Sequence, residues 1–395
     1  MLPLIENLET TIYMKKFLFL VAMAATIVMA GCSEQAALKR DLKQALKVAV
    51  EQDKQQAQRI EPLEDKFPRT FEKGEVKFTG AKGWVSGFFP ASLWLLYEHT
   101  GDEELKAYAE KFTRRLESIK DYKGTHDLGF MIFCPFGNAY RLTGDEYYKE
   151  VIKQASESLA SRYDPEVGCI RSWNTGRKEN PELDFMVIID NMMNLEMLEW
   201  CGGYSEITRS HADKTIENHF REDNSTFHVV AYNELTGEVV ERRTKQGDAD
   251  DSAWARGQSW GLYGYTMMYR MTGEKRYLEQ AEKIANYLIP RLPEDAIPNW
   301  DYDAEKQFKD SSAGSIMASA LIELYGHTQN EKYLAVAERQ LRSLMSEAYF
   351  AKVGENGNFL LMHGVGHLPG RSEVDVPLSY GDYYFIEAAM RYLAL

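Results

Sequence analysis

The chain is poor in cysteine and has no stretch rich in proline, glycine or serine that would mark a linker between domains. Only 4 of its 395 residues are Cys. Cys32 ends an apolar leader, which leaves Cys134, Cys169 and Cys201, and a core of this size needs no disulfide framework. We therefore expect these three side chains to be buried as small apolar groups.

Signatures of nucleotide and metal sites are absent as well. There is no Gly-x-Ser-x-Gly elbow, phosphate-binding loop or dinucleotide fingerprint. His363 and His367 frame a glycine-containing loop instead of lying on a zinc-binding helix, and Asp248, Asp250 and Asp251 lack the spacing of an EF-hand. We expect neither a metal ion nor a cofactor.

Acidic residues outnumber basic ones, and the formal net charge is −14. Such a chain is repelled by nucleic acids and by anionic membrane surfaces. Aromatic residues make up 12% of the chain, with 7 Trp and 23 Tyr. This content suits a groove that stacks against sugar rings as well as a large core.

The N-terminal residues have the pattern of a bacterial export signal. Two lysines follow Met14, residues 17–29 are apolar, and residues 30–32 read Ala-Gly-Cys, which is typical of lipoprotein processing. The apolar run is short for a helix that spans a membrane.

This pattern predicts how the chain is divided. We expect residues 1–31 to be a signal segment, with 1–13 as an upstream extension, and residues 32–395 to be one domain. The mature protein would be an exported bacterial lipoprotein at the periplasmic side of the outer membrane, attached to it only through a lipid on Cys32.

One phrase recurs along the domain: an aromatic residue, followed three positions later by Thr-Gly and an acidic residue. Its glycines are Gly101, Gly144 and Gly273, and weaker copies lie at residues 200–203 and 325–329. Each copy follows one apolar helical stretch and precedes another, so the glycine is expected to end a helix in a left-handed conformation. The five copies predict five helical hairpins.

A lone helix over residues 36–58 and another over 383–393 can complete a sixth pair by meeting each other. The sequence thus predicts an all-α fold, an (α/α)6 barrel or six-hairpin toroid. An open helical array is the alternative on the repeats alone.

The first helix of each predicted pair opens with residues that do not belong in a core. These openings are residues 83–90, 125–130, 185–191, 251–260, 310–313 and 379–383. If alternate helices run parallel around the inside of a barrel, all six openings line one pocket, and their N-termini favour an anionic ligand.

The candidate site residues in and near these openings suit an acidic sugar. Tryptophans offer stacking faces, an arginine offers a fork for a carboxylate, and two aspartates offer acid–base chemistry. They are Trp84, Trp173, Trp254, Trp260, Arg256, Asp127 and Asp190. Asp190 ends the apolar run 185–189, where desolvation raises the pKa of a carboxyl and suits it to donate a proton.

Structural roles are open alternatives for these side chains. Asp127 and Asp190 can each be an N-cap. Arg256 can pair with Asp251 or Asp382.

Two histidines also have structural alternatives. His126 beside Asp127 can be a framework histidine, and His228 lies in a predicted β-hairpin, where a lone histidine is usually structural.

The openings together resemble glycoside hydrolase family 88, the unsaturated glucuronyl hydrolases. The resemblance rests on four motifs in order and extends from about Gly83 to the final helix. The motifs are Trp84 with Gly87-Phe88-Phe89-Pro90, His126-Asp127-Leu128-Gly129-Phe130, Ile189-Asp190-Asn191-Met192-Met193-Asn194-Leu195, and Trp254-Ala255-Arg256-Gly257-Gln258-Ser259-Trp260-Gly261.

The resemblance implies an (α/α)6 barrel that removes a 4,5-unsaturated uronic acid from the non-reducing end of oligosaccharides made by polysaccharide lyases. It implies that Asp190 protonates carbon 4 of a vinyl ether and then takes a proton from water adding at carbon 5, while Asp127 is the second essential carboxylate. His228, Gln246 and Arg256 would contact the sugar and position water.

The resemblance also implies that His126, Trp84, Trp173 and Trp260 form the pocket wall. Residues 364–377 resemble a family loop that reads substituents. Glycosaminoglycan fragments are the expected substrates. An unsaturated rhamnogalacturonyl hydrolase acting on pectin fragments and a non-catalytic sugar-binding lipoprotein are the alternatives.

Overall fold

The computed structural model describes residues 33–174 and 183–395, so the predicted signal segment and Cys32 lie outside the described residues. The described residues fall into two units, with the division between Ala45 and Leu46. In the first, residues 33–45 are helical. Within the described ranges, no helix is both long and apolar enough to cross a membrane. The second unit carries the fold and the site.

The helices of the second unit form an inner and an outer ring. The inner ring consists of α2 (Phe88–Thr100), η2 (Gly129–Gly137) with α4 (Asn138–Thr143), η4 (Ile189–Asn194) with α6 (Leu195–Cys201), α8 (Ala255–Thr272), α10 (Ser311–Thr328) and α12 (Ser379–Leu393). The outer ring consists of residues 46–60, α3 (Glu103–Arg114), α5 (Glu146–Ala160), α7 (Ser205–His219), α9 (Lys275–Leu288) and α11 (Glu331–Leu344). Short 3-10 turns are η1 (Glu117–Ile119), η5 (Ile289–Arg291) and η6 (Asn356–Asn358).

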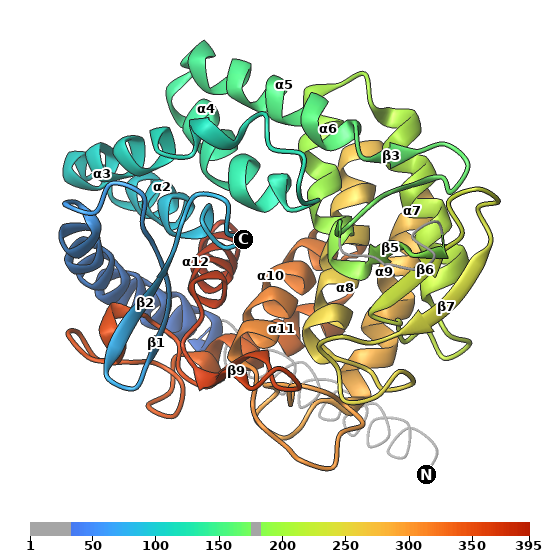
Figure 1. Cartoon of the computed structure of the whole chain (residues 1–395). Coiled ribbons are helices and arrows are strands. Elements are labelled where there is room, and N and C mark those ends of the chain that lie inside the picture. Colours follow the sequence, from blue (N-terminus) through green and yellow to red (C-terminus); the bar gives the residue numbers. More distant parts are fainter. Residues whose placement is uncertain (1–32, 175–182) are drawn as a thin grey trace, which may run out of the picture. The chain divides into compact units, whose positions relative to one another are not determined.

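Around the inner ring each element packs on the next, and α12 packs on α2, so the ring is closed. Figure 1 shows α8, α10 and α12 toward the middle of this unit, with α3, α5 and α7 at its periphery. Asp53 on the first outer helix and Ser379 at the start of α12 line the same small cavity. The first outer helix and the last inner helix are therefore neighbours. The predicted (α/α)6 barrel is confirmed, and the open array is excluded.

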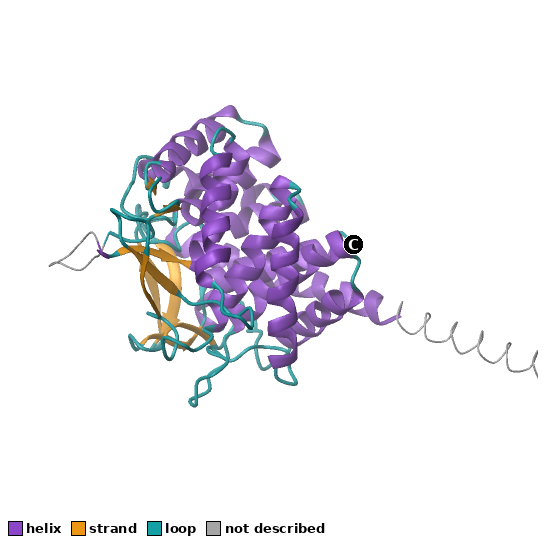
Figure 2. Cartoon of the chain, turned by 90° about the vertical axis from the view of Figure 1, so that its right-hand side faces the viewer, coloured by secondary structure: helices purple, strands orange, loops and turns teal. Residues whose placement is uncertain are grey.

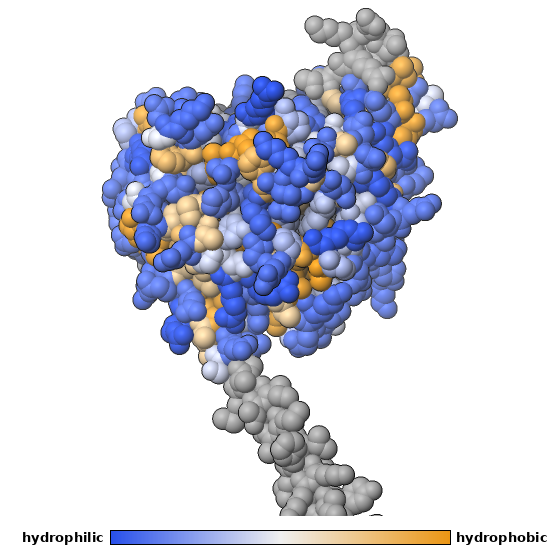
Figure 3. Space-filling view, turned by 90° about the horizontal axis from the view of Figure 1, so that it is seen from below, coloured by the Kyte–Doolittle hydropathy of each residue, from blue (hydrophilic) through white to orange (hydrophobic). Residues whose placement is uncertain are grey.

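The two rings differ in how they are buried. The inner helix α8 buries every side chain from Ala255 to Met268. The outer helix α9 buries Tyr277, Ala281 and Ile284 along one stripe and leaves its other face to solvent. Figure 3 accordingly shows a mainly hydrophilic surface with only small hydrophobic patches on the face in view.

The repeated turns adopt the predicted geometry. Gly101 ends α2 with φ 68° and ψ 19°, and its N–H donates to the carbonyl of Tyr97. Asp102 then caps α3, because its carboxylate accepts from the N–H of Glu104 at 2.9 Å. The copy at Gly202 differs, because its φ of 79° is combined with a ψ of 159°, which lies outside the left-handed helical region.

Gly87, just before α2, shows why the openings lie so close together. A Cβ built on Gly87 would lie 2.1 Å from the carbonyl oxygen of Phe130, a distance that no side chain can tolerate. This backbone contact holds the start of α2 against η2. It therefore fixes Trp84 relative to Asp127.

Small antiparallel sheets gather at one end of the helices (Figure 2). They are β1 (Phe67–Glu72) with β2 (Glu75–Thr79), β3 (Tyr163–Asp164) with β4 (Cys169–Ile170), β5 (Phe185–Ile188) with β6 (Val229–Tyr232) and β7 (Val239–Arg243), and β8 (Gly364–His367) with β9 (Ser372–Val376). The β6–β7 pair is the expected hairpin, although His228, which was expected within it, lies directly before its first strand.

Two expectations need correction. The run that precedes Asp190 was expected to open a helix, but Phe185–Ile188 is strand β5, paired with β6 through Ile188 and Val229. All of its consecutive apolar side chains are buried, on both faces of the strand. A short continuous apolar run of this kind lacks the alternation that would distinguish a strand from a helix. Of the three cysteines, only Cys169 is buried, while Cys134 and Cys201 are half-buried.

Candidate active site

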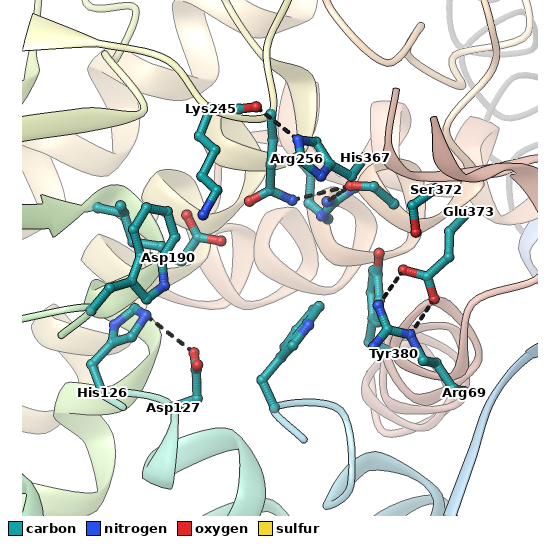
Figure 4. Close-up of a pocket in the computed structure, with 15 residues that line it drawn as sticks. Arg69, His126, Asp127, Asp190, Lys245, Arg256, His367, Ser372, Glu373 and Tyr380 are labelled. Carbon is teal, nitrogen blue, oxygen red and sulfur yellow. Dashed lines mark hydrogen bonds and ion pairs between the residues drawn. The ribbon is translucent and has the colours of Figure 1, made fainter. Parts of the chain in front are cut away.

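A pocket lies where the inner helices begin, and Figure 4 shows its walls. It is lined by Arg69, Trp84, His126, Asp127, Trp173, Ile188, Asp190, Lys245, Gln246, Arg256, Gly366, His367, Ser372, Glu373 and Tyr380. Asp127 and Asp190 therefore share one pocket, as the sequence predicted.

Seven of the ten predicted residues line the pocket, whereas His228, Trp254 and Trp260 are buried behind it. The opening of α10 is also behind the wall. Asp310 caps α10 by accepting from the N–H of Ser312 at 3.1 Å, and it is fully buried. The prediction that all six openings line the pocket is wrong for this one.

Asp190 is buried at the start of η4. Asp190 is 9% exposed, and its Oδ2 has no hydrogen-bond partner among the described residues. The pKa of Asp190 is raised to about 7. Burial is the largest cause and the charge of Asp127 adds to it, while the charge of Arg256 and hydrogen bonds from the backbone and the Trp260 indole act in the opposite direction. Asp190 is thus a carboxyl that holds a proton near neutral pH.

Asp127 is oriented by its sequence neighbours. The hydroxyl of Thr125 donates to its Oδ2 at 2.5 Å, and Nε2 of His126 lies 3.2 Å from its Oδ1. Burial lowers the pKa of His126, so this imidazole is neutral. Asp127 therefore presents a fixed carboxylate to the pocket.

The capping alternative fails for both aspartates. The N-cap positions of η2 and η4 are Leu128 and Ile188, and neither segment has a side-chain cap. η2 is π-helical and η4 is a 3-10 helix, so the regular helices begin only after the two carboxylates. Such irregular turns are common at functional sites.

His228 stands behind Asp190 in a defined tautomer. Its Nδ1 accepts from the backbone N–H groups of Lys245 and Gln246, both at 3.1 Å, so the ring proton is assigned to Nε2. Burial holds the pKa of His228 well below its usual value. Nε2 lies 3.9 Å from Oδ2 of Asp190, a separation that a bridging water or substrate hydroxyl can span.

Trp254 and Trp260 support these groups from behind. Trp254 packs on His228 with ring centroids 4.5 Å apart, and the guanidinium of Arg256 lies 4.5 Å from the centroid of Trp254. Trp260 is fully buried against Phe130. Neither indole lines the pocket: Trp254 packs against His228 and Arg256, and Trp260 packs against Phe130.

Arg256 was expected to grip a carboxylate of the ligand, with Asp251 or Asp382 as alternative partners. Its guanidinium instead pairs with Asp310, with Nη1 3.2 Å from Oδ2, and donates to the carbonyls of Val365 and Gly366. The alternative that Arg256 forms an ion pair within the protein is confirmed, but its partner is Asp310 and neither of the two aspartates expected.

The aromatic walls are Trp84 and Trp173. The Trp84 ring lies 4.8 Å from that of Tyr380 on α12, and Trp173 meets His228 edge-on at 6.1 Å. Gln246 is also fixed, because its side-chain amide donates to the carbonyl of Gly366 at 3.1 Å. These flat faces suit a sugar ring.

Several lining residues were missed. Arg69 on β1 makes two hydrogen bonds of 2.7 Å to Glu373 on β9. Lys245 lies directly before Gln246 on the loop after β7. For Lys245, proximity to Gln246 was the only available signal. For Arg69 there was none, because β1 meets β9 at the pocket through contacts between segments far apart in the sequence.

The two histidines considered for a metal have other partners. Nδ1 of His363 lies 2.6 Å from Asp375, and Nε2 of His367 lies 2.9 Å from the carbonyl of Lys245. Among the described residues, no group of three or more His, Cys, Asp or Glu side chains is placed to hold a metal ion.

Two carboxyl groups, one with a raised pKa, share a pocket with aromatic walls, and such a pair suits the acid–base cleavage of a carbohydrate. The model of Glycosyl Hydrolase Family 88 matches residues 59–391, and the chain belongs to this family.

Individual relatives agree with this assignment. An unsaturated glucuronyl hydrolase of Formosa agariphila is 42% identical, over 82% of this chain and 84% of its own length. An unsaturated chondroitin disaccharide hydrolase of Streptococcus pyogenes serotype M1 is 31% identical, over 90% of this chain and 92% of its own. The crystal structure of an unsaturated glucuronyl hydrolase specific for heparin superposes with a TM-score of 0.86 at 44% identity, covering 89% of this chain and 97% of that one.

Proposed function

We propose that this glycosidase hydrates the double bond of a terminal 4,5-unsaturated uronic acid, with Asp190 as the acid and then the base. The enzyme removes such a residue from oligosaccharides that lyases release, and we infer that glycosaminoglycan fragments are its substrates. The observation that supports this mechanism is that Asp190, buried and with its pKa raised to about 7 mainly by burial, shares one pocket with Asp127.

In the proposed reaction, the carboxyl of Asp190 gives its proton to carbon 4, and the positive charge that develops at carbon 5 is shared with the ring oxygen. The oxygen of a water molecule bonds to carbon 5 and returns a proton to the Asp190 carboxylate. The hemiketal then opens to a ketone at carbon 5, which leaves a hemiacetal at carbon 1 that expels the rest of the chain. His228 Nε2 and Gln246 are positioned to orient the water.

The test follows the ultraviolet absorbance of the conjugated double bond in lyase digests of several glycosaminoglycans and of rhamnogalacturonan. We expect the absorbance to fall with glycosaminoglycan digests, because hydration removes the double bond. Turnover of the pectin digest alone would contradict the substrate assignment. Binding of the disaccharides without any loss of absorbance would contradict the catalytic assignment.

We further propose that the chain is exported and anchored by a lipid on Cys32 at the periplasmic side of the outer membrane. The support is the lysine pair, apolar run and Ala-Gly-Cys of residues 14–32. In cells expressing the full chain, Cys32→Ser is expected to move the protein from the membrane fraction to the soluble fraction. An unchanged distribution would refute the anchor.

A further inference from the structure

The cations of the pocket differ in how they are engaged. Among the described residues, the Lys and Arg side chains that line it are Arg69, Lys245 and Arg256. Arg256 is buried and held by Asp310 together with two backbone carbonyls. Arg69 has Nε and Nη2 directed at Glu373, each at 2.7 Å. Both guanidinium charges are therefore matched by a carboxylate of the protein.

Lys245 differs from these two arginines. Within the part of the chain that the structure describes, its ammonium forms no ion pair with an acidic side chain, and it lies over the face of Trp173, 4.3 Å from the ring centroid. In Figure 4 the side chain points into the pocket, toward Asp190. An unpaired charge over an aromatic face is available to an anion of the substrate.

The backbone of Lys245 is fixed from both sides. Its N–H donates to Nδ1 of His228 at 3.1 Å, and its carbonyl lies 2.9 Å from Nε2 of His367. Since the other ring nitrogen of His228 faces Asp190, this histidine fixes the position of the Lys245 backbone relative to the proton donor. A preorganised charge of this kind loses less freedom on binding than a lysine on a mobile loop.

We propose that Lys245 binds the carboxylate of the terminal unsaturated uronate and so places carbon 4 at Asp190. This inference rests on the proposed function. The carboxyl group is attached to carbon 5, one bond from the carbon that Asp190 protonates, so an ion that grips it must lie on the Asp190 side of the pocket. The lysine also offsets the repulsion between that carboxylate and Asp127.

The experiment combines Lys245→Met with a disaccharide whose uronate is methyl-esterified. We expect Lys245→Met to lower kcat/KM on the free acid about tenfold, mainly through KM, because one charge-assisted contact is lost. On the ester the two proteins are expected to be nearly equal, because the substrate no longer carries the charge. Esterification also changes the reactivity of the double bond itself, but this effect is the same for both proteins. It therefore cancels when kcat/KM of Lys245→Met is divided by that of the unaltered protein on each substrate.

Two further variants sharpen the result. Lys245→Arg keeps the charge and is expected to retain most of the activity. Lys306→Met is the matched control, because the Lys306 ammonium also lies over an aromatic ring, 4.8 Å from the centroid of Phe308, but outside the pocket. It is expected to leave kcat/KM unchanged.

Sulfated and unsulfated forms of the same disaccharide separate the two anionic groups that a substrate can offer. An equal loss on both supports the proposal. A loss only with the sulfated form, or an equal loss on acid and ester, would overturn it. Failure of the proposed function is distinct, since the unaltered protein would then show no loss of absorbance with any glycosaminoglycan digest.

Discussion

Asp190→Asn is expected to abolish hydration of the unsaturated uronate while the protein stays folded. General acid–base catalysis is worth about 10²- to 10⁴-fold in rate, and an amide at this position can neither give nor accept the proton. The same absorbance assay on the purified variant measures the effect. Activity close to that of the unaltered protein would mean that another group protonates carbon 4.

Stability should not suffer from this substitution. The folded-state pKa of Asp190, about 7, lies above its ordinary value of 3.8, so the protein binds this proton more tightly than the unfolded chain does. The buried acid therefore costs stability as pH rises above the ordinary value, and the cost reaches its full size above pH 7. Asparagine removes that cost, so thermal unfolding at pH 8 is expected at an equal or higher temperature.

Asp382→Asn is the matched control for Asp190→Asn. Burial also raises the pKa of Asp382 to about 7, and its carboxylate accepts from the N–H groups of Leu360 and Leu361 at 2.9 Å, outside the pocket. Substitution there alters a buried aspartate of similar character. We expect its kcat to remain near that of the unaltered protein.

Asp127→Asn is expected to lower kcat/KM strongly, on the order of 10²-fold, because a carboxylate beside the developing positive charge is lost. It should also change the pH dependence. The charge of Asp127 raises the pKa of Asp190, so its removal lowers that pKa and moves the alkaline limb of the kcat/KM profile to lower pH.

The shift of the alkaline limb of the kcat/KM profile in Asp127→Asn is limited in size. Burial is the largest cause of the raised pKa of Asp190, and burial is unchanged in Asp127→Asn, so the limb moves only part of the way toward the ordinary range. A profile measured from pH 5 to 9 gives the displacement. An unmoved limb would show that the two carboxylates act independently.

The ring of helices could be predicted because its signal is local. Each turn needs a left-handed residue and a cap within three positions, as at Gly101 and Asp102, and this requirement is visible in the chain itself. The strand before Asp190 was missed because a short apolar run looks the same in a buried strand and a buried helix.

The sequence predicted those site residues that lie at the beginnings of the inner helices. Asp127, Asp190 and Trp84 were found in this way. Arg69 and Lys245 lie on or beside strands, and their place in the pocket depends on pairing between distant segments. The partner of Arg256 was missed for the same reason, because Asp310 lies 54 residues further along the chain.

The central claim is that Asp190 carries a proton when the substrate arrives. Infrared difference spectra between the unaltered protein and Asp190→Asn, recorded from pH 5 to 9, test it directly, because the contributions of the other buried carboxyls cancel, including that of Asp382. The expected difference is a carbonyl band of a protonated carboxyl at low pH, lost with a midpoint near pH 7. A carboxylate band at position 190 already at pH 5 would contradict the account.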